Sequence, residues 1–254
     1  MAGEDKKRIK MILPVPVPPE ALAMFESQLP QHLKRPDIQV DFVAPKNGAK
    51  ILDSFYEMTL ADAFVLDACA LAEEEGYAAV CLNSMSDSGV PALRSRLSIP
   101  VVGPGQASFL TACLLGKKFS VLTMWKPWFP LYEKTVRELG IEHRLASIRH
   151  IDTRPDASEL LAGKEDSVFD ALTREGRAAI AEDGADVIIL GSTTMHQSHA
   201  HLVEHLPAPV INPGLVALKQ CEMLLDLGLS HSKIAYQQPE VYNDAVLGPV
   251  PSAL

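Results

Sequence analysis

The sequence predicts an α/β fold made of two Rossmann-like lobes, each with a parallel sheet. Short aliphatic runs alternate with amphipathic helical stretches along the chain, which is typical of helices that cover parallel strands. The second half of the chain repeats the order of elements in the first half, and such repetition indicates an internal duplication. We therefore expect two similar lobes related by a pseudo-twofold axis, with the active site in the cleft between them.

The expected strands are short runs of β-branched or aliphatic residues. In chain order they are residues 11–17, 39–43, 78–82, 101–102, 119–122, 145–148, 187–190 and 210–211. Between them, apolar spacing predicts helices that include residues 60–75, 129–139 and 167–182. A left-handed helix cap needs no Cβ, so we expect such caps at the glycines that follow helical stretches, namely Gly76, Gly116, Gly140, Gly184 and Gly228.

Two polar segments, residues 83–89 and 191–196, occupy corresponding points of the two halves. Each follows an aliphatic run, and each precedes a Pro-Val pair, a Pro-Gly pair and an apolar helix. Ligands of open parallel sheets bind beyond the carboxyl ends of the strands, which is where both segments fall. The lobes that we expect are residues 1–115 plus 210–254 and residues 116–209, and neither is expected to fold alone.

Composition narrows the class of protein. The chain has 254 residues, of which 47% are hydrophobic, and a net charge of −9 without a cluster of Lys and Arg. This balance disfavours nucleic acid and anionic membranes as partners. The sequence shows neither a secretion signal nor an apolar stretch long enough to span a bilayer, so we expect a cytoplasmic protein.

The four cysteines lie inside apolar runs, without the close paired spacing of zinc or redox sites. We expect buried thiols, no metal and no cofactor. Cys81 in particular falls within an expected strand, upstream of the first polar segment. His201 and His205 have the i, i+4 spacing of shared metal ligands, but no accompanying carboxylate is fixed by a known signature. Glu57 is expected to cap a helix that begins near Thr59.

The two polar segments resemble motifs of the aspartate/glutamate/hydantoin racemase superfamily, which also contains maleate isomerase and arylmalonate decarboxylase. The family's Cys-x-x-Asp-x-Gly loop corresponds here to Ser84-Met85-Ser86-Asp87-Ser88-Gly89, which Ile-Pro-Val-Val-Gly follows at residues 99–103. The second family signature, Gly-Cys-x-x-Met, corresponds to Gly191-Ser192-Thr193-Thr194-Met195. The resemblance covers nearly the whole chain, but Ser84 and Ser192 stand at the two cysteine positions.

The resemblance implies a cofactor-independent isomerase or racemase that acts on a small carboxylate or cyclic amide through an enolate or oxyanion, and a homo-oligomer. A thiol, with an ordinary pKa near 8.5, can alternate between acid and base, whereas an alkyl hydroxyl is rarely ionised at neutral pH. Ser84 and Ser192 therefore need a neighbouring base for two-base chemistry, and Asp87 and His196 are the candidates. A hydrolase or lyase that uses Ser, Asp and His, and a non-catalytic binding homologue, are alternatives.

The resemblance also indicates residues that would contact the substrate. The family's first substrate loop corresponds to a proline-rich segment with Pro16 and Val17, which offers no side-chain donor. The remaining candidates match positions in the two polar loops or at the end of a strand where family members hold a substrate-facing tyrosine. They are Met85, Ser86, Thr193 and Thr194 in the loops, and Thr123 and Trp125 at the strand end.

Overall fold

The computed structural model describes residues 6–155 and 165–244 and divides into two compact units. Unit 1 contains the chain up to Gly103 and again from Ala217 onward, and unit 2 is Pro104–Val216. Residues 104–115 and 210–216 thus belong to unit 2, whereas the sequence interpretation assigned both segments to the first lobe.

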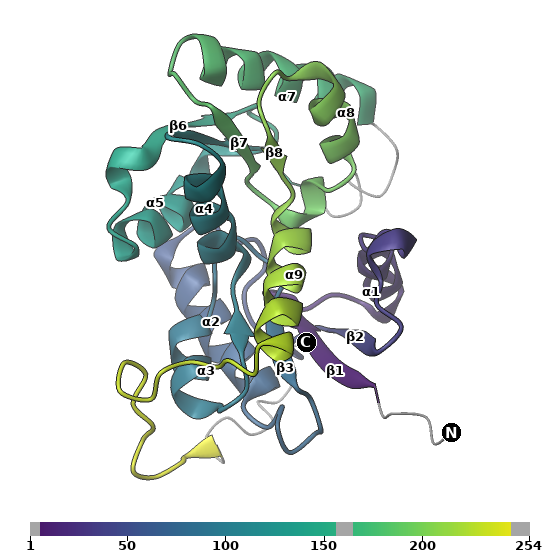
Figure 1. Ribbon diagram of the computed structural model, residues 1–254, viewed down its shortest axis with the longest axis vertical. Coiled ribbons are helices and arrows are strands. Elements are labelled where there is room, and N and C mark those ends of the chain that lie inside the picture. The colour runs from purple at the N-terminus through teal and green to yellow at the C-terminus, as the bar shows by residue number, and fades with distance from the viewer. Residues whose placement is uncertain (1–5, 156–164, 245–254) are drawn as a thin grey trace. The chain divides into compact units, whose positions relative to one another are not determined.

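Unit 1 contains a parallel sheet of four strands in the order β2-β1-β3-β4 (Figure 1). A buried cluster that includes Val65, Val80, Leu93 and Val101 joins its helices α2 and α3 to the sheet. The strands are β1 (Lys7–Ile12), β2 (Ile38–Val43), β3 (Ala79–Leu82) and β4 (Val101–Val102). The helices are α1 (Pro19–Glu26), η1 (Gln31–Leu33), α2 (Phe55–Cys69), α3 (Val90–Arg96) and, from Ala217 onward, α9 (Pro213–Asp226).

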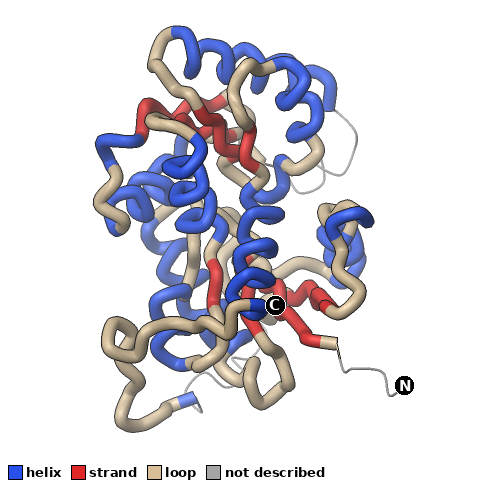
Figure 2. Tube along the Cα trace, viewed as in Figure 1, coloured by secondary structure: helices blue, strands red, loops and turns tan. Residues whose placement is uncertain are grey.

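Unit 2 contains a second parallel sheet in the order β6-β5-β7-β8. Its strands are drawn in red and its helices in blue (Figure 2). Its strands are β5 (Phe119–Thr123), β6 (Leu145–His150), β7 (Val187–Leu190) and β8 (Val210–Ile211). Its longer helices are α4 (Pro104–Leu115), α5 (Phe129–Glu138), α7 (Glu165–Ala181) and α8 (Ser198–His205). Its short 3-10 turns are η2 (Lys126–Trp128), η3 (Glu142–Arg144) and η4 (Thr193–Met195).

The two sheets have the same strand order, which confirms the predicted α/β class with two parallel sheets. The strands correspond one to one, β1 with β5, β2 with β6, β3 with β7 and β4 with β8. Each polar segment follows the third strand of its sheet, β3 or β7. The two units therefore share one strand topology, as the internal duplication in the sequence predicts.

The prediction for the first strand is wrong, because β1 is Lys7–Ile12 and ends before the prolines. Proline has no backbone N–H to donate to a neighbouring strand, so the strand ends before Pro14. The charged residues Lys7, Arg8 and Lys10 lower the hydropathy of β1, so its first residues were not recognised as a strand. Lys10 is only 4% exposed. Its ammonium donates to the carbonyl oxygen of Ala68 at 2.6 Å and pairs with the carboxylate of Glu75 at 2.6 Å. Lys10 is therefore buried with two hydrogen-bond acceptors, at a position where the sequence alone predicts an exposed side chain.

Helix boundaries differ from the prediction where a cap decides them. Helix α2 begins at Phe55 because the hydroxyl of Ser54 accepts a hydrogen bond from the N–H of Glu57. The carboxylate of Glu57 does not cap this helix; it accepts the N–H groups of Lys50, Ile51 and Leu52 in the preceding loop, which lowers its pKa despite the opposing effect of burial.

Four of the five predicted glycine caps have positive φ, and Gly116 does not. At Gly116 the requirement is space, because an added Cβ would lie 2.6 Å from Cγ2 of Val187 and would overlap the carboxylate of Asp186. That carboxylate accepts the N–H groups of Lys117 and Lys118, the two residues after Gly116. The glycine therefore permits a close approach between two chain segments.

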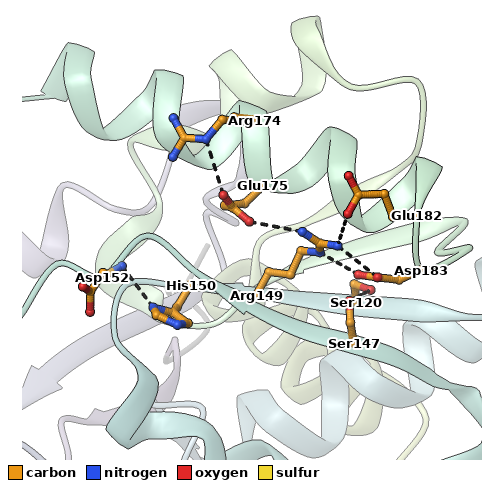
Figure 3. A network of polar contacts seen from close by, with 9 residues as sticks. All are labelled: Ser120, Ser147, Arg149, His150, Asp152, Arg174, Glu175, Glu182 and Asp183. Atoms are coloured by element: carbon orange, nitrogen blue, oxygen red, sulfur yellow. Dashed lines mark hydrogen bonds and ion pairs between the residues drawn. The ribbon is translucent and has the colours of Figure 1, made fainter.

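Unit 2 ties its edge strand β6 to helix α7 through one arginine (Figure 3). The guanidinium of Arg149 lies 2.6 Å from Asp183, 2.8 Å from Glu182 and 3.3 Å from Glu175. Hydrogen bonding to Arg149 lowers the pKa of Asp183. Three carboxylates on one cation fix the carboxyl end of α7 against the sheet, so this network is structural.

Candidate active site

The first polar loop leaves β3 at the carboxyl edge of the unit 1 sheet. The N–H of Asn83 donates to the carbonyl of Ile12 at 2.8 Å, which continues the pairing with β1 by one residue. Beyond it the chain turns, and Gly89 takes φ of +70° and donates its N–H to the carboxylate of Asp62 on α2 at 2.8 Å. An added Cβ at Gly89 would lie 3.1 Å from the carbonyl of Asp62.

Three serine hydroxyls of this loop form a chain. The Oγ atoms of Ser84 and Ser86 are 2.9 Å apart, and those of Ser86 and Ser88 are 2.8 Å apart. Ser84 also accepts the N–H of Ser86 at 3.3 Å. Ser86 and Ser88 are buried, whereas Ser84 is partly exposed. When each hydroxyl donates toward Ser84, the Ser84 oxygen accepts two hydrogen bonds and its own proton is free to donate to a ligand.

The second polar loop repeats this arrangement at the carboxyl end of β7. The N–H of Gly191 donates to the carbonyl of Leu122 at 2.7 Å, as Asn83 does to Ile12. The hydroxyl of Ser192 accepts the N–H of Thr194 at 3.2 Å and lies 2.8 Å from the hydroxyl of Thr194. Each loop therefore presents one partly exposed serine whose oxygen accepts hydrogen bonds from the residue two positions later.

Tyr132 supports the second loop and was missed in the sequence. It is fully buried on α5, and its hydroxyl donates to the carbonyl of Gly191 at 2.8 Å and lies 2.7 Å from the hydroxyl of Thr123. Burial raises the pKa of Tyr132. Thr123 is likewise 0% exposed, so its hydroxyl is committed to Tyr132. This packing requires glycine at position 191, because an added Cβ would lie 2.7 Å from the Tyr132 hydroxyl, 2.8 Å from Cβ of Thr123 and 2.9 Å from the Leu122 carbonyl oxygen.

Asp87 lies over the backbone of Gly103, the residue before α4. It has φ of +50°, and a Cβ added to Gly103 would overlap the Asp87 carboxylate, whose Cγ is 2.5 Å from the added atom. The second half differs here, because Met195 replaces the aspartate and Asn212 replaces the glycine. Asn212 caps the next helix itself by accepting the N–H of Leu215 at 3.4 Å. The Asp87 side chain therefore occupies the space that a glycine leaves free at position 103.

The remaining sequence-predicted residues lie at the carboxyl edges of the two sheets. Pro16 is exposed and Val17 partly buried in the loop after β1. Met85 and Thr193 are only 2% and 3% exposed, so their side chains are not accessible to a ligand and a contact would have to use their backbone groups. Trp125 is partly buried after β5, and the guanidinium of Arg154 lies 5.8 Å from its ring centroid.

The histidines after the second loop have separate structural contacts. His196 is partly exposed and donates its backbone N–H to the carbonyl of Thr193 at 3.3 Å. The rings of His201 and His205 stack at 4.0 Å, and Nε2 of His201 lies 3.1 Å from the hydroxyl of Thr173. Within residues 6–155 and 165–244, no group of three His, Cys, Asp or Glu side chains is arranged to hold a metal ion.

Cys81 is buried in β3 beside Cys221 of α9, and both are 0% exposed. Burial, together with the neighbouring Cys81 thiol, raises the pKa of Cys221. The thiolate is the reactive form of cysteine, and a raised pKa disfavours it, so we interpret this pair as packing residues.

No helix among the described residues is long and apolar enough to cross a bilayer.

Comparison with known proteins identifies relatives over most of the chain. The sequence model described as Asp/Glu/Hydantoin racemase matches residues 20–221. A hydantoin racemase from Pseudomonas sp. (strain NS671) is 31% identical over 207 residues, which cover 81% of this chain and 82% of the relative. Among solved structures, allantoin racemase from Klebsiella pneumoniae superposes with a TM-score of 0.83 at 25% identity, over 93% of this chain and 95% of that chain. Allantoin racemase from Pseudomonas fluorescens gives 0.82 at 28% identity, over 93% and 98%.

Proposed function

Because the chain belongs to the Asp/Glu/hydantoin racemase family, we propose that it binds a small cyclic amide of the hydantoin class and exchanges the proton on the carbon next to a ring carbonyl. The observation that carries this proposal is the repeated hydroxyl pair, Ser84 with Ser86 and Ser192 with Thr194. The printed names of the relatives, hydantoin racemase and allantoin racemase, support the substrate class.

The serines act as hydrogen-bond donors in this proposal. When the carbon loses its proton, negative charge moves to the neighbouring carbonyl oxygen and gives an enolate. A donor already aimed at that oxygen stabilises the transition state more than the substrate. The oxygens of Ser84 and Ser192 already accept backbone N–H groups, so their hydroxyl protons can turn toward the ligand. An alkyl hydroxyl stays protonated at neutral pH, which suits a donor and does not suit a base.

The proton acceptor that we propose is His196. Of the two titratable residues in the polar loops, Asp87 is only 7% exposed and packs against Gly103, whereas His196 is partly exposed in the second loop. A neutral imidazole takes the proton from carbon, and the imidazolium exchanges it with solvent and returns it to the same carbon. A single base works from one face of the carbon, so exchange proceeds faster than inversion.

The serine contacts argue against a hydrolase that attacks through serine. A nucleophilic serine needs a base within hydrogen-bond reach of its oxygen. Among the described residues, the hydrogen-bond partners of Ser84 belong to Ser86, and those of Ser192 belong to Thr194. Within its own unit, neither serine contacts an imidazole or a carboxylate among the described residues, so the donor role fits these contacts better.

Proton exchange in deuterated water tests the proposal. One enantiomer of a 5-substituted hydantoin is incubated with the protein, loss of the ring C–H signal is followed by NMR, and inversion is followed by chiral chromatography. The wild type is expected to exchange the proton faster than buffer does. Ser84→Ala and Ser192→Ala should each lower the exchange rate by about 10²-fold, the usual effect of losing one oxyanion donor. His196→Gln should reduce exchange to the buffer rate.

A matched control is Ser27→Ala, because the exposed hydroxyl of Ser27 donates only to the carbonyl of Met24 in unit 1. It should leave exchange unchanged. If hydantoins bind to the wild type but exchange no faster than in buffer, the enzyme proposal fails and a binding protein remains. If exchange occurs and both serine variants retain it, the donor role of the serines is wrong.

A further inference from the structure

After α9 the chain runs past α3 of unit 1 (Figure 1), and its residues 230–242 form no helix or strand. We call residues 230–244 the C-terminal strap. It lies beyond the residues that the family matches, which end at 221. Its contacts with α3 and β4 are polar and directed, so it does more than cover apolar surface.

Lys233 of the strap caps the carboxyl end of α3. Its ammonium donates to the carbonyl of Arg94 at 2.7 Å and of Ser95 at 3.3 Å, and also to that of Leu97. The last carbonyls of a helix have no partner inside the helix and carry its negative dipole end. One ammonium with three such acceptors holds this terminus firmly.

Tyr236 acts through Arg94, which is 6% exposed and joins three segments. The Arg94 guanidinium donates from Nε to the carbonyl of Val101 in β4 at 3.1 Å and from Nη1 to the hydroxyl of Tyr236 at 3.0 Å. Farther along the strap, Asp244 pairs with Arg96 at 2.9 Å. Helix α3 is thus tied both to the sheet and to the strap.

The strap also forms hydrogen bonds with backbone groups at and just before the edge strand of the sheet. Strand β4 is an edge strand, and the N–H of Val101 donates to Nε2 of His231 at 2.7 Å. The hydroxyl of Ser230 donates to the carbonyl of Ser98. Burial, reinforced by the charges of Arg94 and Lys233, lowers the pKa of His231 to about 4, so the ring is neutral and can accept this hydrogen bond.

Helix α3 is the direct continuation of the first serine loop. It begins at Val90, and its first turn is closed by the N–H of Val90 on the carbonyl of Asp87 at 3.2 Å and by the N–H of Leu93 on that of Gly89 at 2.8 Å. With seven residues it is too short to be stable by itself. Its position, and with it the geometry of the chain from Ser84 to Ser88, depends on tertiary contacts at both ends.

We propose that Lys233 and Tyr236 are positioning residues for the first serine loop, which they hold in place through α3. The contact at the amino end of α3 comes from α2, and its carboxyl half is held by the strap together with Val101 of β4 and Glu74. Loss of the strap contacts removes part of this support and allows the serine chain to shift. The catalytic part of this inference rests on the proposed function, but the structural part does not.

Amide hydrogen exchange of the intact protein tests the structural part. Tyr236→Phe removes one hydroxyl, and Lys233→Met removes the cap. Both should raise the exchange rate at least threefold for residues 86–97 and leave residues 192–205 unchanged. Ile234→Ala is the matched control, because its side chain is 98% exposed in the same strap, and it should behave as the wild type. Unchanged exchange over residues 86–97, or an equal rise over both segments, would overturn the proposal.

Hydantoin exchange kinetics test the catalytic part. Because the strap touches no substrate in this account, Tyr236→Phe should lower kcat about threefold or more with little change in KM, and Lys233→Arg should retain more activity than Lys233→Met. Local amide exchange that rises while kcat stays at the wild-type value would refute the link to the serine loop. If the wild type itself exchanges no hydantoin proton, the proposed function fails while the amide-exchange result still decides whether the strap holds the loop.

Discussion

Replacing Tyr132 with phenylalanine removes one hydroxyl from the interior of unit 2. That hydroxyl joins Thr123 at the end of β5 to the carbonyl of Gly191 at the start of the second serine loop, at 2.7 and 2.8 Å. The ring stays in place, but two buried polar groups lose a partner. One buried group left without a partner costs about 1–3 kcal/mol, so we expect the free energy of unfolding to fall by about 2 kcal/mol. For a protein of this size that corresponds to a fall in Tm of about 4–8 °C.

The assay compares urea unfolding of the wild type, Tyr132→Phe and the control Tyr56→Phe by circular dichroism. Tyr56 is 72% exposed, so loss of its hydroxyl should leave the unfolding midpoint unchanged. The same variants are then tested for hydantoin exchange, which should fall for Tyr132→Phe because Gly191 precedes Ser192. An unfolding midpoint for Tyr132→Phe equal to that of the wild type would refute the reasoning that this hydroxyl holds the loop.

Further predictions address the first loop, the unit 2 edge and the strap. Gly103→Ala should destabilise the protein by about 1–3 kcal/mol, measured by urea unfolding, because the new Cβ overlaps the carboxylate of Asp87. Arg149→Met leaves the carboxylates of Glu175 in α7 and of Glu182 and Asp183 just after it without their cation, and it should lower the free energy of unfolding by about 1.5–3 kcal/mol in the same assay. The pKa of His231 is lowered to about 4, so stability that is fully present above pH 6.5 should be lost as the pH falls toward 4, because only the unfolded chain binds the proton in that window. Thermal melts across this range should show a shallower loss for His231→Gln; an equal slope would contradict this assignment.

The sequence located the two loops because their motifs are local. Ser84 and Ser192 each follow an aliphatic strand by two residues and precede a Pro-Val strand, so their placement at carboxyl edges needed only the alternation of elements. The paired hydroxyls could not be read in this way. They depend on the turn that brings Ser86 and Thr194 back onto the preceding serines.

Residues that act across long chain separations were missed. Tyr132 lies 59 residues from Gly191, and Tyr236 lies 142 residues from Arg94. Contacts over such separations produce no periodic pattern in the sequence, and the apolar residues of the strap do not follow the spacing of a helix or a strand. Asp87 was identified, but its close packing against Gly103 could not be read from the sequence. The arrangement of the two serine loops around a common cleft stays a prediction.

The most direct test of the donor role restores cysteine at both positions. The double variant Ser84→Cys, Ser192→Cys is compared with the wild type on one enantiomer of a 5-substituted hydantoin in deuterated water, with exchange and inversion measured on the same sample. We predict that the wild type exchanges the proton faster than it inverts the carbon, and that the double variant gains inversion at a rate close to exchange. A wild type that inverts as fast as it exchanges would contradict the account, because its serines would then be acting as a pair of bases.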